Sequence, residues 1–156
     1  MDWLFIAFLA ASLFHMGEEY FYPGGFMDVM KRLNPKFAPS VTVRMAVVIN
    51  GMQLLLCILV VLIGRTVPLL GMSVASLLLF NGVTHLAACV RTGRYVPGVA
   101  TGTVFYIPVS VHAFHVFISA GRVSIPYILA AAALGLVYQA VPIAYLGIAS
   151  ALRKAR

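Results

Sequence analysis

A short segment near the amino terminus carries the residues best suited to chemistry in this chain. It reads His15-Met16-Gly17-Glu18-Glu19, so an imidazole is followed by carboxylates three and four positions later. In an α-helix these spacings bring side chains onto one face. Imidazole and carboxylate groups gathered from facing helices are typical ligands of iron, manganese or zinc. The segment therefore predicts one part of a metal site.

Histidines in two later apolar runs could complete such a site. His85 lies near the end of one run, at a depth that matches the first segment, and a further run holds His112 and His115. If that further run becomes helical near Gly102, His112 lies about 15 Å from the helix start and level with the first segment. If it becomes helical at Gly98, His115 lies nearer the opposite surface and outside the cluster.

The predicted site combines ligands with polar neighbours that orient them. The predicted metal ligands are His15, Glu18, Glu19, His85 and His112. Both glutamates are also the predicted catalytic groups. The ligands would hold one or two divalent ions of iron, zinc or manganese, and no organic cofactor is indicated. The expected orienting neighbours are Asn50, Asn81, Tyr106, Tyr138 and Gln139. The alternative for Asn50, Gln139, the tyrosines and His115 is a hydrogen bond between packed helices.

The paired glutamates need a positive partner. Two adjacent carboxylates lie inside an apolar run with no Lys or Arg at a matching depth. Such groups must be neutralised by protonation or by a cation. Arg44 or Arg91, from neighbouring connections, could pair with one glutamate, whereas a divalent cation would neutralise both.

The rest of the chain has the composition of a membrane protein. Of its 156 residues, 62% are hydrophobic and 10% are charged, whereas soluble domains average about 45–50% and 25%. This composition excludes a soluble globular enzyme. Five apolar runs have the length of a membrane-spanning helix, and they cover Trp3–Tyr22, Val41–Gly64, Val67–Val90, Gly98–Ala120 and Ile125–Ala151. We therefore expect an all-α fold in which residues 1–156 form a single domain of about five transmembrane helices.

Three further features refine this expectation. No basic residue precedes the first run, so we expect a retained helix and not a cleaved signal. The connection over residues 23–40 contains the segment MDVMKRL, which is expected to lie along the membrane interface. Cys57 and Cys89 lie in apolar runs without CxxC spacing, so we expect packing residues and neither a disulfide nor a zinc ribbon.

The basic residues indicate the orientation of the helices. One side holds nine of them: Lys31, Arg32, Lys36, Arg44, Arg91, Arg94, Arg153, Lys154 and Arg156. The other side holds Arg65 and Arg122. The positive-inside rule then predicts an external N-terminus and a cytoplasmic C-terminus. The net charge of +7 is spread over short loops, which favours a membrane surface and argues against nucleic acid as the partner.

The ordered polar residues resemble those of a known family. The pattern is His15-x-x-Glu18-Glu19, then Asn81-x-x-x-His85, then Arg94-Tyr95-x-Pro97-Gly98-x-x-Thr101. Over residues 3–120 this set resembles the HXXEE-domain family of small multi-helix bacterial membrane proteins. The resemblance implies a multi-pass protein of the bacterial inner membrane and implies that these positions form a site. It implies no particular reaction.

These observations favour an intramembrane metalloenzyme. It would act by hydrolysis or oxidation on a lipid or another hydrophobic substrate that enters from the cytoplasmic leaflet. One alternative is a metal-free, isomerase-like acid–base enzyme in which a buried glutamate donates a proton. Another is a proton- or metal-coupled carrier, and a structural protein is a third. The expected partners are membrane lipids, the substrate and, for a carrier, further copies of the chain.

Overall fold

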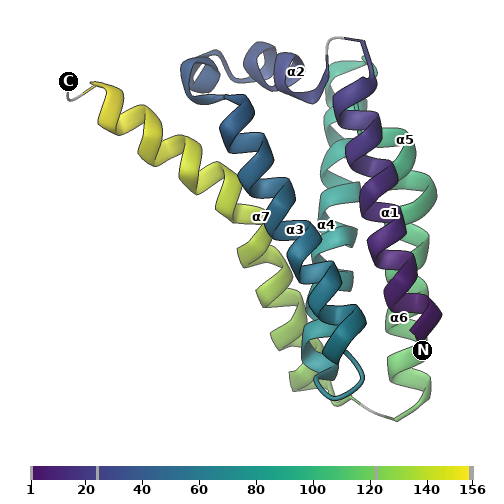
Figure 1. Cartoon of the computed structure of the whole chain (residues 1–156). Helices are drawn as coiled ribbons and strands as arrows, with labels where there is room; N and C mark the ends of the chain where they lie inside the picture. Colours follow the sequence, from purple (N-terminus) through teal and green to yellow (C-terminus); the bar gives the residue numbers. More distant parts are fainter. Residues whose placement is uncertain (1, 24, 122, 155–156) are drawn as a thin grey trace.

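The computed structural model describes residues 2–23, 25–121 and 123–154. These ranges contain helices and no strand. In chain order the elements are α1 (Asp2–Phe21), α2 (Gly25–Leu33), η1 (Pro35–Ser40), α3 (Val43–Ile63), α4 (Pro68–Thr92), α5 (Val99–Thr101), η2 (Gly102–Tyr106), α6 (Ile107–Ser119) and α7 (Ile125–Lys154). η1 is a 3₁₀ helix, and η2 is a π-helical turn that continues into α6. Figure 1 shows the long helices as a bundle, with α2 across one end.

Within the described residues, five helical segments are long and apolar enough to cross a membrane. They are Trp3–Phe21, Val43–Ile63, Pro68–Thr92, Val99–Ser119 and Ile125–Arg153. Each begins and ends within two residues of a predicted run. The prediction of an all-α bundle with about five spanning helices is confirmed. If all five segments cross the membrane, the two termini lie on opposite sides, and the orientation stays a prediction.

Local sequence determines where these helices begin and end. The Thr42 hydroxyl accepts a hydrogen bond from the Met45 N–H and so caps the start of α3. Pro68 stands in the first turn of α4, where the absence of an N–H costs no helical hydrogen bond. Gly93 follows α4 with a φ of +61°, a left-handed conformation that ends many helices and suits glycine.

α4 is the central helix of the bundle. It packs against α7 and against the combined η2 and α6, and its residues from Gly71 to Leu78 are buried without a break. α7 approaches closely because Gly135 faces Ser76, whose Cβ would lie 2.4 Å from a Cβ added to the glycine. Small residues at such contacts let membrane helices pack tightly.

The connection between α1 and α3 closes one end of the bundle (Figure 1). α2 contains the MDVMKRL segment, with Asp28 in its first turn and Lys31 and Arg32 in its last. This distribution of charge suits the helix dipole. Leu146 of α7 forms a small apolar cluster with Val41, so α7 reaches the same end of the bundle.

Some sequence predictions concern single residues apart from the predicted site. Cys57 and Cys89 are both free thiols, and Cys57 is fully buried, as expected of a packing residue. Arg122 and Arg156, which contributed to the predicted orientation, lie outside the described residues.

Candidate functional site

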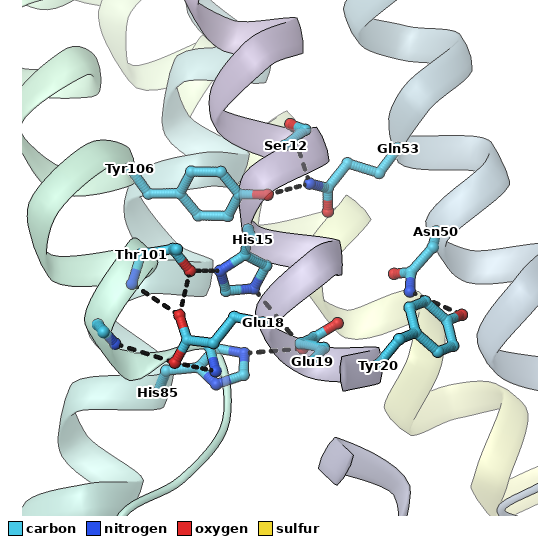
Figure 2. Close-up of polar contacts among 12 residues, drawn as sticks. Ser12, His15, Glu18, Glu19, Tyr20, Asn50, Gln53, His85, Thr101 and Tyr106 are labelled. Atoms are coloured by element: carbon cyan, nitrogen blue, oxygen red, sulfur yellow. Dashed lines mark hydrogen bonds and ion pairs between the residues drawn. The ribbon is translucent and has the colours of Figure 1, made fainter. Parts of the chain in front are cut away.

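Two histidines and one glutamate meet where α1 crosses α4. His15 and Glu19 stand one turn apart on α1, and His85 comes from α4. Glu19 Oε1 lies 3.6 Å from Nε2 of His15 and 3.3 Å from Nε2 of His85. One ligand atom from each residue lies within 4.8 Å of the others, and all three residues are buried. Figure 2 shows both imidazoles turned toward the Glu19 carboxylate. We call this group the His/Glu trio.

A chain of hydrogen bonds orients His15 within the trio. Thr101 Oγ1 lies 2.5 Å from Glu18 Oε2 and 3.0 Å from His15 Nδ1. Because an ionised carboxylate only accepts, the single hydroxyl proton of Thr101 goes to Glu18. Thr101 then accepts from Nδ1 of His15, which leaves a lone pair on Nε2 in the neutral ring. This Nε2 atom is buried without a hydrogen-bond partner among the described residues.

The rings of the trio are held by close packing. Tyr106 stacks on His15 with ring centroids 4.3 Å apart, and His85 meets His15 edge-on at 4.9 Å. Phe26 of α2 covers His85 at 5.1 Å. Gly98 lies against both histidines with a φ of +95°, and an added Cβ would stand 2.6 Å from His85 Cε1. The trio therefore lies in a tightly packed, preformed arrangement.

Behind Tyr106 lies a buried polar network that the sequence analysis missed. The Gln53 side-chain amide donates to the Tyr106 hydroxyl at 2.5 Å and to Ser12 Oγ at 3.2 Å. Ser12 Oγ in turn lies 3.4 Å from Cys57 Sγ. Tyr106 thus packs directly against His15, and its hydroxyl accepts a hydrogen bond from Gln53; its role as an orienting neighbour stays a prediction. The sequence did contain a signal for this network, because Gln53 is a glutamine inside an apolar run.

Glu18 occupies a different environment from its neighbour. Its carboxylate accepts backbone N–H bonds from Gly98 at 2.8 Å, Ala100 at 3.2 Å and Thr101 at 2.8 Å, and a hydroxyl bond from Tyr95. These N–H groups belong to the start of the α5–η2–α6 helix, where a negative charge is stabilised. Partial burial and the hydrogen bond to Glu18 raise the pKa of Tyr95, so the phenol remains a donor.

A comparison with protein families identifies the chain. A family described as proteins of unknown function with an HXXEE motif matches residues 6–113. The chain belongs to the HXXEE family. Comparison with curated proteins and with solved structures gave no match.

The residues of the HXXEE motif divide between two roles in this protein. His15 and Glu19 contribute to the His/Glu trio, whereas Glu18 caps a helix. Consecutive residues on an α-helix point about 100° apart, so the two carboxylates diverge. The prediction that Glu18 joins the ligands is corrected accordingly: its oxygens are already engaged by N–H and hydroxyl donors.

The structure does not bring His112 to the trio, contrary to expectation. His112 is exposed on α6 and packs against Trp3, with ring centroids 5.2 Å apart. His115, also exposed, lies beside it at 6.5 Å. The helix begins at Val99, one residue after Gly98, the earlier of the two starts considered, and Thr101 is already level with His15. His112 comes eleven residues after Thr101 along the helix, so it lies near the opposite end of α1.

The remaining predicted neighbours face a cavity beside the trio. This cavity measures about 530 Å³, and Asn50, Asn81, Tyr138 and Gln139 line it together with His15, Glu19 and His85. Asn50 donates to the Tyr20 hydroxyl at 3.1 Å and so makes no direct contact with the trio. Asn81 Oδ1 is buried without a partner among the described residues. The HXXEE site therefore consists of a packed trio at the wall of an internal space.

Proposed function

We propose that this HXXEE protein binds a divalent transition metal ion through His15, Glu19 and His85 and acts as an intramembrane metalloenzyme on a hydrophobic substrate. The observation that carries the proposal is the convergence of an anionic carboxylate and two imidazole Nε2 atoms in a buried space. In the described part of the chain, no Lys or Arg pairs with Glu19. A buried carboxylate of this kind needs a positive partner, and a metal ion supplies one.

The hydrogen bonding around His15 favours a metal over a purely structural contact. Thr101 receives the Nδ1 proton, so the Nε2 lone pair points toward Glu19 Oε1 and two acceptors face each other at 3.6 Å. Two such acceptors repel each other unless a cation lies between them, either a proton on Nε2 or a metal ion, and we propose the metal ion. An outer partner that fixes the tautomer of a metal-binding histidine is a recurrent feature of metal sites.

The donor set matches known metal chemistry. Two histidines and one carboxylate hold zinc in hydrolytic enzymes and iron in oxygen-activating enzymes, with coordination positions left open for substrate or water. A metal held in this way polarises a substrate oxygen or activates a bound water. The chain itself provides the orientation of His15 through Thr101 and Glu18, and excludes water from one side through Tyr106 and Phe26.

A metal-free acid–base enzyme is the second candidate. The distance of 3.3 Å between His85 Nε2 and Glu19 Oε1 favours it, because an imidazole and a carboxylate this close can exchange a proton. This candidate predicts full activity in the presence of a chelator, whereas the metalloenzyme loses activity. For either candidate we propose the bacterial inner membrane as the location, with the C-terminus in the cytoplasm.

Cobalt(II) titration of the purified, chelator-treated protein tests the proposal. Cobalt bound by two imidazoles and a carboxylate is expected to give visible absorption bands that saturate as the site fills. Glu19→Gln and His85→Ala should abolish these bands. His112→Ala is the matched control and should retain them, because His112 lies against Trp3. Absence of bands in the parent protein, or bands that survive both trio substitutions, would contradict the proposal.

A further inference from the structure

The cavity beside the trio is large enough for a substrate. Its volume of about 530 Å³ falls in the range of pockets that enclose one small ligand, roughly 300–1,000 Å³. Residues of α1, α2, α3, α4 and α7 line it, so it runs through the interior of the bundle. The trio forms its chemically reactive wall.

Most of the cavity wall is apolar and deformable. Met27 and Met30 of α2 and Met45 and Met52 of α3 all contribute to it. Methionine side chains are flexible and polarisable, so they adapt to ligands of irregular shape. A wall of this kind accommodates an aliphatic chain better than a rigid polar molecule.

The cavity reaches the lipid-facing surface between α3 and α7. Met52 of α3 and Ile143 of α7 both line it, and they are also 45% and 64% exposed. Figure 1 shows α3 and α7 diverging toward the end that α2 covers. Pro142 lies inside α7 beside this rim, where the missing N–H weakens the helix. A membrane-dissolved molecule can therefore enter sideways, without passing through water.

The polar part of the wall selects against an anionic head group. Among the described lining residues the charged side chains are Glu19 and Asp28, and none is Lys or Arg. The other polar side chains are two imidazoles and a set of amides and hydroxyls. The imidazoles are those of His15 and His85, and the amides and hydroxyls come from Tyr20, Tyr22, Asn50, Gln53, Asn81, Thr84, Tyr138 and Gln139. Apart from the proposed metal ion, a phosphate or carboxylate head would meet no opposite charge in the cavity and would lie near the carboxylates of Glu19 and Asp28. A hydroxyl, in contrast, can donate to and accept from the neutral polar groups.

We infer that the cavity binds an uncharged long-chain alcohol, with its hydroxyl at the trio and its chain toward the opening between α3 and α7. This ligand class builds on the proposed function, because the hydroxyl lies at the proposed metal site. The chain occupies the methionine-rich wall, and the hydroxyl occupies the polar end.

Photocrosslinking of the full-length protein in lipid nanodiscs tests this inference with hexadecanol that carries a diazirine on its chain. We expect labelled residues on the cavity walls of α3 and α7. Unlabelled hexadecanol should compete at a concentration about ten-fold lower than hexadecanoic acid. Equal or better competition by the acid, or labelling confined to lipid-facing residues such as Val48, would overturn the inference.

Substitutions at the opening provide a second readout. Met52→Trp and Ile143→Trp should each reduce labelling of the cavity wall about ten-fold by filling the entrance. Val48→Trp and Ile148→Trp are matched controls on the same helices, because both residues are exposed and lie outside the cavity wall. Unchanged labelling in both entrance variants would count against lateral entry and overturn the inference.

Metal content measured on the same samples separates this inference from the proposed function. Protein that contains metal but binds no alcohol refutes the ligand class alone. Protein that binds the alcohol in its cavity but takes up no metal refutes the metal site and leaves the ligand class supported.

Discussion

Gly98 allows both histidines to approach one carboxylate. Its φ of +95° is a conformation that residues with a side chain rarely adopt, and an added Cβ would lie 2.6 Å from His85 Cε1 and 2.7 Å from His15 Cε1. Its N–H also donates to Glu18. If the backbone at Gly98 moved away from the histidines, its hydrogen bond to Glu18, which caps the following helix, would be lost.

Replacing Gly98 with alanine should displace both imidazoles. We expect Gly98→Ala to lower the free energy of unfolding by about 1–3 kcal/mol and to abolish metal binding, as measured by thermal unfolding and metal analysis. Gly93→Ala is the matched control, because Gly93 also has a positive φ of +61° but no atom within 4 Å of an added Cβ. It should lose about 1 kcal/mol and keep its metal. Equal metal content in the two variants would refute this role of Gly98.

The Thr101 hydroxyl links Glu18 to His15, so its removal tests the orientation of the imidazole. Thr101→Val preserves the shape of the side chain and leaves His15 Nδ1 without its partner. We expect metal affinity to fall about 10–100-fold, whereas Thr101→Ser should behave like the parent. Competition with a fluorescent chelator measures both affinities. A valine variant that binds metal as tightly as the serine variant would show that the hydrogen bond does not matter.

Residue spacing predicted that His15, Glu19 and His85 lie together but also placed Glu18 and His112 with them. His15 and Glu19 stand one turn apart, and His85 was placed by matching depths, so these three could be recognised from sequence. Glu18 and Glu19 follow His15 by three and four positions, and both spacings are compatible with one helical face. The two side chains differ in direction because consecutive helical residues point about 100° apart. The capping role of Glu18 depends on the start of a distant helix, which no local pattern in α1 encodes.

At the scale of elements, α4 and η2 cross through a pair of glycines. A Cβ added to Gly82 would lie 2.8 Å from the Gly102 carbonyl oxygen, and one added to Gly102 would lie 3.1 Å from Gly82 Cα. Such contacts let helix backbones approach in membranes. This crossing positions His85 of α4 beside the Gly98–Thr101 segment, so helix packing and site geometry are coupled.

Alanine at Gly82 should therefore separate the two elements. We expect Gly82→Ala to cost about 1–3 kcal/mol of stability, because the neighbouring atom is backbone and cannot rotate away. Gly51→Ala on α3 is the control, since no atom lies within 4 Å of its added Cβ. It should unfold at the parent temperature or slightly higher. Thermal unfolding in detergent measures both, and equal stability of the two variants would contradict the importance of this crossing.

The bounds of the spanning helices could be predicted closely. Which residues of neighbouring helices lie at the same depth could not. Long apolar runs between loops with Gly, Pro and Arg define a helix within two residues. The placement of His112, in contrast, depended on whether the fourth spanning helix begins at Gly102 or several residues earlier. It begins at Val99 and includes a π turn that ends at Tyr106. Pro108 indicates an irregular helix in this region, but it does not determine at which residue the helix begins.

At the scale of the whole molecule, the distribution of basic residues predicts one orientation. Lys31 and Arg32 lie in α2 and Arg91 lies at the end of α4, while Arg65 lies in the turn between α3 and α4. We expect green fluorescent protein fused to the C-terminus to fluoresce in the cytoplasm, and alkaline phosphatase fused there to be inactive. The opposite pair of results would reverse the orientation.

The cavity also belongs to this scale, and sequence analysis did not predict it. It depends on the divergence of α3 from α7 and on α2 closing one end of the bundle (Figure 1). These angles arise from close contacts between helices, such as Gly135 against Ser76. Individual apolar runs carry no information about such angles, although several polar residues that line the cavity, such as Asn50, Asn81 and Gln139, could be named from the sequence.

Metal content of the protein purified in detergent without added metal or chelator tests the central claim most directly. We predict close to one iron, zinc or manganese ion per chain by mass spectrometry, retained in His112→Ala and lost in Glu19→Gln and His85→Ala. In the proposed site the trio supplies the ligands, and His112 lies apart from the trio. A parent protein free of metal even after incubation with all three ions, or equal metal in parent and trio variants, would contradict the account.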